Sequence, residues 1–168
     1  MNSLTRRALS TLIAAGAVAA LTGPAVAVAA PAATGAVLTV SAPNRFNIHV
    51  RIEGVFRMSV EDAKTIIRYM NDHRAGGVTY TLRGDDPGTD DAVLFERFAG
   101  GTGTYPGGEL VVVGEGLHYL REMDVPRQYL NEDDGPFDFT DEVYAQVHLA
   151  YATGGDRFAT SNVAVRQF

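Results

Sequence analysis

Alternating apolar and polar positions mark most of this chain as β-strand. The alternation is clearest in residues 46–53, where every second side chain is apolar. A period of two places successive side chains on opposite faces of a strand, so this segment is predicted to be a half-buried strand. The same pattern runs through residues 141–152. Shorter runs between turn residues predict further strands at 36–40, 78–84, 92–98, 109–114, 116–125 and 157–168.

One segment, residues 60–74, has a helical period instead. Ser59 precedes it, and Asp62 follows three positions later, which approximates a capping box. Gly76 and Gly77 come after the segment and predict a left-handed end to the helix. We therefore expect one amphipathic helix of about four turns. Its apolar stripe is formed by Val60, Ala63, Ile66, Ile67 and Met70.

The order of these elements predicts a mainly β fold. Seven or eight short strands with turn residues between them are typical of an antiparallel β-sandwich. The helix near residues 60–74 is expected to cover one end or edge of the sandwich. An α+β arrangement or a small β-barrel is the alternative. Residues 36–168 are expected to form a single domain, and Phe168 is expected to be packed because the chain ends inside a strand pattern.

The first 29 residues read as an export signal. They combine Arg6 and Arg7 with an apolar run and a small-residue ending. A membrane anchor needs about 20 uninterrupted apolar residues, and here Gly16 and Pro24 break the run. The two arginines fit either a twin-arginine signal or the basic region of a general signal. We therefore expect a secreted, extracellular protein without an integral membrane segment after cleavage, and a flexible lead-in at residues 30–35.

Composition excludes several kinds of chemistry. The chain has no cysteine, which excludes disulfides, thiolate metal sites, a cysteine nucleophile and a lipid anchor on cysteine. The full chain has 14 basic and 20 acidic residues. Removal of Arg6 and Arg7 with the signal leaves 12 basic and 20 acidic residues, a net charge of −8. This balance argues against nucleic acid as a partner, because nucleic-acid binding requires a basic face.

Two acidic segments, residues 84–91 and 131–142, lie between predicted strands. Pro87 and Gly88 are explained by a turn alone, whereas the extra carboxylates require water or a counter-charge. Ca²⁺ binds six to eight oxygen ligands, often from several loops. The sequence therefore leaves open either a calcium site or two solvated loops. The candidate ligands are Asp85, Asp86, Asp90, Asp91, Asp133, Asp134 and Asp138.

Catalytic motifs are weak in this sequence. The three histidines after the signal and lead-in that lie on predicted strands, His49, His118 and His148, are far apart and have no metal-ligand spacing. Ser161 lacks the nucleophile-elbow pattern. The Gly-rich segment 99–108 precedes a strand and lacks the Gly-Lys-Ser/Thr ending of a phosphate loop, so a mobile loop is expected there.

These observations favour a secreted, non-catalytic binding protein whose ligand is a protein or a carbohydrate. Calcium bound by the acidic loops could modulate it. The alternative is a small secreted hydrolase that uses carboxylates or a Ser/His pair. Most aromatic side chains are expected in the core or in cross-strand pairs. Phe137 and Phe139 are the exception, because they lie in an acidic segment where apolar side chains need a partner.

Overall fold

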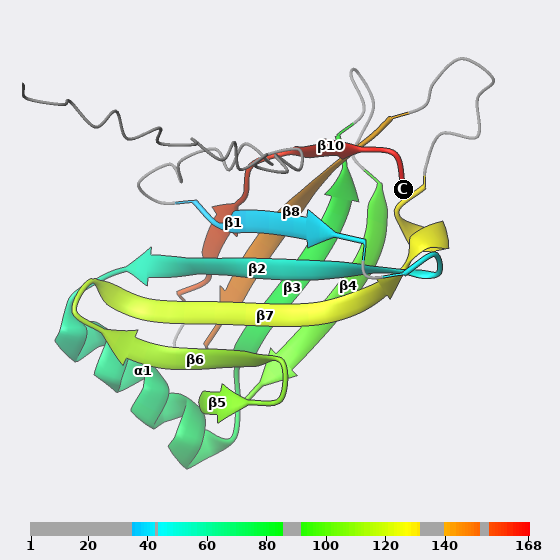
Figure 1. Ribbon diagram of the computed structural model, residues 1–168. Coiled ribbons are helices and arrows are strands. Elements are labelled where there is room, and N and C mark those ends of the chain that lie inside the picture. The colour runs from blue at the N-terminus through cyan, green and yellow to red at the C-terminus, as the bar shows by residue number, and fades with distance from the viewer. Residues whose placement is uncertain (1–34, 43, 86–91, 132–139, 152–154) are drawn as a thin grey trace, which may run out of the picture.

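Two antiparallel sheets packed face to face make up the protein (Figure 1). The computed structural model describes residues 35–42, 44–85, 92–131, 140–151 and 155–168. The first sheet has the order β1 (Val37–Ser41), β2 (Asn47–Arg57), β7 (Gly116–Pro126), β6 (Gly108–Val113), β5 (Gly103–Tyr105). The second has the order β10 (Ala164–Arg166), β8 (Asp141–Ala150), β3 (Gly77–Gly84), β4 (Val93–Gly100), with β9 (Arg157–Thr160) also paired to β8.

The predicted fold class is confirmed, since the described strands form two separate sheets with one α-helix. Strands of the second sheet cross those of the first at a steep angle (Figure 1). The alternation in the sequence explains which side chains face inward. Every second residue of β8 is buried, from Asp141 to Leu149. On β2, the same alternation buries Ile48, Val50 and Ile52.

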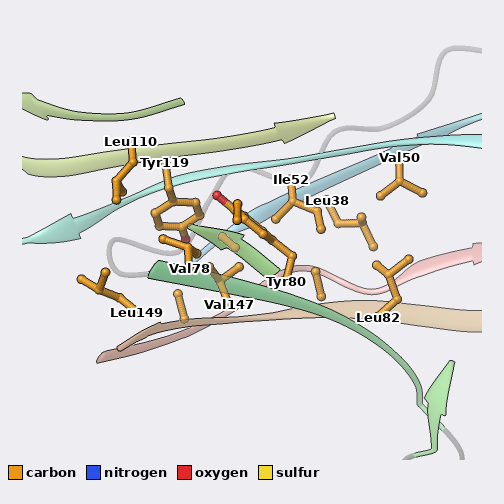
Figure 2. Packing of buried hydrophobic residues seen from close by; sticks show 14 of the residues in the cluster. Leu38, Val50, Ile52, Val78, Tyr80, Leu82, Leu110, Tyr119, Val147 and Leu149 are labelled. Carbon is orange, nitrogen blue, oxygen red and sulfur yellow. The ribbon is translucent and has the colours of Figure 1, made fainter. Parts of the chain in front are cut away.

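The core lies between the two sheets (Figure 2). Tyr80 on β3 and Tyr119 on β7 are its largest fully buried side chains. Their ring centroids lie 6.3 Å apart in an edge-to-face arrangement, a geometry that aromatic pairs prefer. Gly54 on β2 lies opposite Tyr119, and a Cβ atom at this glycine would clash with the Tyr119 hydroxyl. The glycine therefore provides the space that the tyrosine ring fills.

The helix α1 (Val60–His73) runs across one end of the sandwich and packs against β6 and β7 (Figure 1). Ser59 caps it as predicted, because its Oγ accepts a hydrogen bond from the Asp62 N–H at 3.0 Å. The predicted left-handed end of the helix is confirmed, but it begins at Arg74 rather than at the glycines. Arg74 adopts the left-handed conformation with φ 50°, and Gly76 follows with φ 87°. Ala63, Ile66 and Met70 are the buried members of the predicted stripe.

The predictions for two segments, one expected to be a loop and one expected to be a strand, were wrong. The Gly-rich segment 99–108, expected to be a mobile loop, contains the end of β4 and the short strand β5. Positive φ angles at Gly101, Gly103 and Gly107 form the bends around it. Residues 157–168, expected to be one strand, divide into β9 and β10, which pair with different parts of β8. The described residues therefore form ten strands rather than seven or eight.

Side chains seal the edge of the first sheet at β1. Asn162 Oδ1 accepts a hydrogen bond from the Leu38 N–H at 2.9 Å, and its Nδ2 donates to the Leu38 carbonyl at 3.2 Å. Arg166 Nη1 donates to the Val40 carbonyl at 3.1 Å. The packing of Phe168 is confirmed, since this side chain is 6% exposed. Backbone groups of β1 thus bond to side chains of the β9–β10 connection and of β10, which belong to the second sheet.

In the described part of the chain, no helix has the length and apolar character that a bilayer crossing requires. The predicted export signal, residues 1–29, lies outside the described residues, as does most of the lead-in. A short 3₁₀-helix, η1 (Arg127–Tyr129), follows β7. Because the core fills the space between the two sheets, we look for a site on their outer faces.

Candidate functional site

Paired charges cover the outer face of the first sheet. Arg51 on β2 donates from Nη1 to Glu122 Oε1 at 2.6 Å and from Nη2 to Glu53 Oε2 at 2.5 Å. The hydrogen bond to Glu122 is the largest of the effects that raise the pKa of Arg51. Exposed pairs of this kind contribute at most about 1 kcal/mol each. This face is a solvated surface whose charges satisfy one another.

Two histidines on the same face each pair with a carboxylate. His49 Nδ1 is 2.9 Å from Asp124 Oδ1, and His118 Nδ1 is 2.9 Å from Glu109 Oε1. Ser41 is opposite His49 in the register, so a serine, a histidine and an aspartate stand in one row. The His49 and Asp124 side chains are 40% and 60% exposed. The row therefore lacks the water-excluded surroundings in which acyl-transfer sites work.

The outer face of the second sheet carries exposed aromatic side chains instead. Phe98 on β4 is opposite Thr79 on β3. Thr79 is opposite His148 on β8, and His148 is opposite Phe158 on β9. Directly paired residues share one face of a sheet, so these four side chains form a single line, which we call the aromatic row. Phe98 and Phe158 are 60% and 61% exposed, and Phe98 also lines a pocket together with Met70 and Asn71 of α1.

At one end of the aromatic row, Phe158 and His148 form a flat stack. Their ring centroids are 4.3 Å apart and the ring planes differ by 4°. Asp156 Oδ1 lies 3.5 Å from His148 Nε2, at the edge of the imidazole. The stack holds the phenyl ring in one orientation, which lowers the entropy that a ligand-contacting side chain loses on binding.

At the other end of the row, the Phe98 ring lies against the backbone of two glycines. A Cβ atom at Gly77 would be 2.5 Å from Phe98 Cζ, and one at Gly100 would be 3.1 Å from Phe98 Cε1. The ring therefore occupies the space above these glycines and turns its opposite face to solvent. Adjacent strands lie about 4.8 Å apart. The two phenylalanines, three strands apart, are thus anchored about 14 Å from each other.

Polar side chains fill the neighbouring line on the same face, where the charged Glu96 stands beside Thr81 and Gln146, and Arg83 lies one line further on. Thr81 Oγ1 donates to Glu96 Oε2 at 3.2 Å. Arg83 Nε donates to Gln146 Oε1 at 3.3 Å. Hydroxyl and amide groups can each donate and accept hydrogen bonds. The second sheet therefore combines flat aromatic surface with neutral hydrogen-bonding groups, which the first sheet does not.

Ser161, the serine considered for a hydrolase, braces the strands. Its Oγ accepts a hydrogen bond from the Ala145 N–H at 2.8 Å and lies 2.7 Å from the Asn162 carbonyl, to which it donates. Both interactions hold the connection between β9 and β10 against β8. No histidine bonds to this hydroxyl in the described residues, so this geometry does not favour a Ser161-based nucleophile.

Of the predicted calcium ligands, the described residues include only Asp85. Its N–H donates to the Glu142 carbonyl at 2.8 Å, so the described ends of the two acidic segments, Asp85 and Glu142, lie side by side at one end of the second sheet. Asp141 is 3% exposed, and its carboxylate accepts a hydrogen bond from the Phe168 N–H. Among the residues described, no three metal-binding side chains gather. The other six, Asp86, Asp90, Asp91, Asp133, Asp134 and Asp138, lie outside the described residues, as do Phe137 and Phe139.

Sequence reasoning missed the two phenylalanines that are exposed on the second sheet. One signal was present: Phe95 and Phe98 are three positions apart on a strand and must face opposite sides. Because Phe95 faces inward opposite Leu82, Phe98 faces outward. Phe158 gave no such signal, since its exposure depends on its pairing with His148.

Three comparisons with known proteins were made, and none found a relative. No family model, no curated protein and no solved structure matches this chain. The geometry of the two sheets is therefore what supports a functional proposal.

Proposed function

We propose that this protein is a secreted, non-catalytic carbohydrate-binding protein and that the aromatic row is its binding face. The observation that carries the proposal is the pair of exposed, fixed phenyl rings, Phe98 and Phe158, on one open sheet. A sugar ring has an apolar face of C–H groups that packs on an aromatic face, and it has hydroxyls at its rim. Such a ligand requires flat rings with hydrogen-bonding groups beside them.

The surroundings of the aromatic row support a carbohydrate over a protein partner. Thr79 lies between the two rings, and Thr81 and Gln146 lie on the next line of the same face. Such residues can bond to sugar hydroxyls at little desolvation cost, because the groups carry no net charge. Protein interfaces instead use a large apolar centre surrounded by a polar rim. The exposed large apolar side chains on this face are the two rings together with Val93 and Val165, which occupy separate positions in the register.

Export is part of the proposal, and it rests on residues 1–29 alone. A sugar polymer outside the cell would be reached only by an exported protein. The hydrolase alternative is less favoured, because Ser161 is used as a brace and the His49–Asp124 pair is exposed. A role for Ca²⁺ in shaping the acidic segments stays a prediction.

A depletion assay with insoluble polysaccharides tests the proposal. The purified protein is mixed with cellulose, chitin, xylan and starch granules, and the protein left in solution is measured. We expect binding to at least one polymer and a loss of affinity of about fivefold to a hundredfold for Phe98→Ala or Phe158→Ala, since stacking on an aromatic side chain contributes about 1–3 kcal/mol.

Phe46→Ala is the matched control. Phe46 is 64% exposed, similar to the two phenylalanines of the aromatic row, but it lies just before β2 of the first sheet. Its replacement should leave polymer binding unchanged. Retention of every polymer in the supernatant, or equal losses for Phe46→Ala and Phe98→Ala, would show that the aromatic row is not a sugar-binding face.

A further inference from the structure

A pocket of about 450 Å³ adjoins Phe98, at the end of the aromatic row that lies on β4. The last turn of α1, the residues that join it to β3, and the bend between β4 and β5 form its walls. Besides Phe98, the side chains that line it are those of Met70, Asn71, Arg74 and Ala75. Because Phe98 is itself part of the wall, a sugar ring that stacks on this phenyl ring would border the pocket and could extend a substituent into it.

Two side chains of the pocket can donate hydrogen bonds to a ligand. Asn71 Oδ1 accepts a hydrogen bond from Thr102 Oγ1 at 2.6 Å. This bond joins α1 to the turn before β5 and leaves Nδ2 of Asn71 as a donor. In the described part of the chain, Arg74 forms no ion pair and no side-chain hydrogen bond, so its guanidinium donors are also available.

The backbone of Arg74 is a second, independent observation. Its φ of 50° makes Arg74 the one residue other than glycine with a positive φ among those described. A Cβ atom makes the left-handed region unfavourable, and glycine is the usual residue at such a position after a helix. The helix dipole favours a cation at this end and offsets part of the cost. Strained backbone conformations of this kind cluster at binding sites.

The rest of the pocket is apolar or carries negative partial charge. Met70 and Ala75 contribute apolar surface beside Phe98. The pocket lies at the C-terminal end of α1, where the dipole places about half a negative charge and where carbonyl groups lack partners within the helix. A ligand group suited to these surroundings accepts hydrogen bonds from Asn71 and Arg74, donates one to a carbonyl, and has an apolar part.

We propose that this pocket binds the acetamido group of an N-acetylated amino sugar, so that the ligand is a polysaccharide containing N-acetylhexosamine. This inference rests on the proposed function and specifies its ligand class. The acetamido carbonyl accepts from Arg74 and Asn71, its N–H donates to a carbonyl at the end of α1, and its methyl group packs on Met70 and Ala75. A sugar hydroxyl lacks the methyl group, and a carboxylate lacks both the methyl group and the N–H.

Three tetrasaccharides with the same sugar ring and linkage test this inference. The tetrasaccharides of chitin, chitosan and cellulose differ only at carbon 2, which carries an acetamido, an ammonium or a hydroxyl group. Each is titrated into the purified protein by calorimetry in about 0.15 M salt, which screens long-range attraction of the ammonium groups to the acidic protein. The acetamido form should bind about tenfold more tightly than either of the others, because only this form satisfies the donors and covers the apolar wall.

Variants locate the preference in this pocket. Arg74→Gly suits the positive φ, so it should leave the melting temperature unchanged or raise it, while it reduces the preference for the acetamido form by about threefold or more. Asn71→Asp keeps the oxygen that accepts from Thr102 and removes the Nδ2 donor, so it should also reduce the preference. Arg68→Gln, on the exposed side of α1, is the matched control and should leave it unchanged. Phe98→Ala should weaken binding of the chitin and cellulose forms alike.

The outcomes separate this inference from the proposed function. Equal affinity for the acetamido and hydroxyl forms, no binding of the chitin tetrasaccharide, or an undiminished preference in Arg74→Gly overturns the acetamido inference. If cellulose or another polymer still binds through Phe98 in the depletion assay, the proposed function stands in each of these cases. If no saccharide binds in either assay, both are overturned.

Discussion

Individual side chains show how strictly the interior of this sandwich is filled. Tyr80 and Tyr119 are fully buried, and burial is the largest cause that raises the pKa of each phenol above its ordinary value. The folded protein must therefore keep both groups neutral. In the unfolded chain they ionise near their ordinary pKa of about 10. Their contribution to stability is complete below that pH and is lost as the pH rises above it.

The alkaline limit of stability tests this account of the buried phenols. The free energy of unfolding should be nearly constant from about pH 7 to about pH 9 and should fall above about pH 10, by up to about 1.4 kcal/mol per pH unit for each tyrosine. Urea unfolding at several pH values measures it. Tyr119→Phe should make the fall shallower, whereas Tyr129→Phe, at an exposed side chain, should not. An equal alkaline fall in both variants would contradict the account.

At the scale of elements, local patterns in the sequence predicted most of the strands and the helix. The alternation in β2 and β8 and the cap at Ser59 were enough to predict these elements, because each pattern is set by neighbours in the sequence. The division of residues 157–168 into β9 and β10 was not predictable. It depends on Ser161 and Asn162, whose side chains bond to other strands.

The two hydrogen bonds between the Asn162 side chain and Leu38 of β1 give a prediction about how these elements are held together. Asn162→Ala removes both side-chain hydrogen bonds to Leu38 and should lower the free energy of unfolding by about 1–3 kcal/mol. Because the chain has no tryptophan, urea denaturation followed by far-ultraviolet circular dichroism measures this loss of free energy of unfolding. Val163→Ala, at the next and 40% exposed position, should cost much less. If the two substitutions cost the same, Asn162 does not hold this edge.

For the whole molecule, pairing between distant strands creates the difference between the two faces. The aromatic row joins residues from Thr79 to Phe158 only because β3 pairs with both β4 and β8, and β8 pairs with β9. No local pattern in the sequence contains that order. The sequence did show two acidic segments, and the hydrogen bond from the Asp85 N–H to the Glu142 carbonyl joins their described ends at the second sheet.

A calcium titration addresses the acidic segments of the whole protein. If these segments bind Ca²⁺, calorimetry should detect heat on addition of the ion, and the melting temperature should rise with calcium and fall with a chelator, because a ligand of the folded state stabilises it. Asp90→Asn together with Asp134→Asn should abolish both effects. No heat and no change in melting temperature would leave the segments as solvated loops.

The most direct test of the central claim is a map of the bound ligand on the two sheets. Amide chemical shifts are recorded by nuclear magnetic resonance while a soluble fragment of the bound polysaccharide is added. The account predicts that the largest changes fall at Thr79, Phe98, His148 and Phe158, with little change at Arg51 on the opposite face. Changes centred on the first sheet, with the aromatic row unaffected, would contradict it.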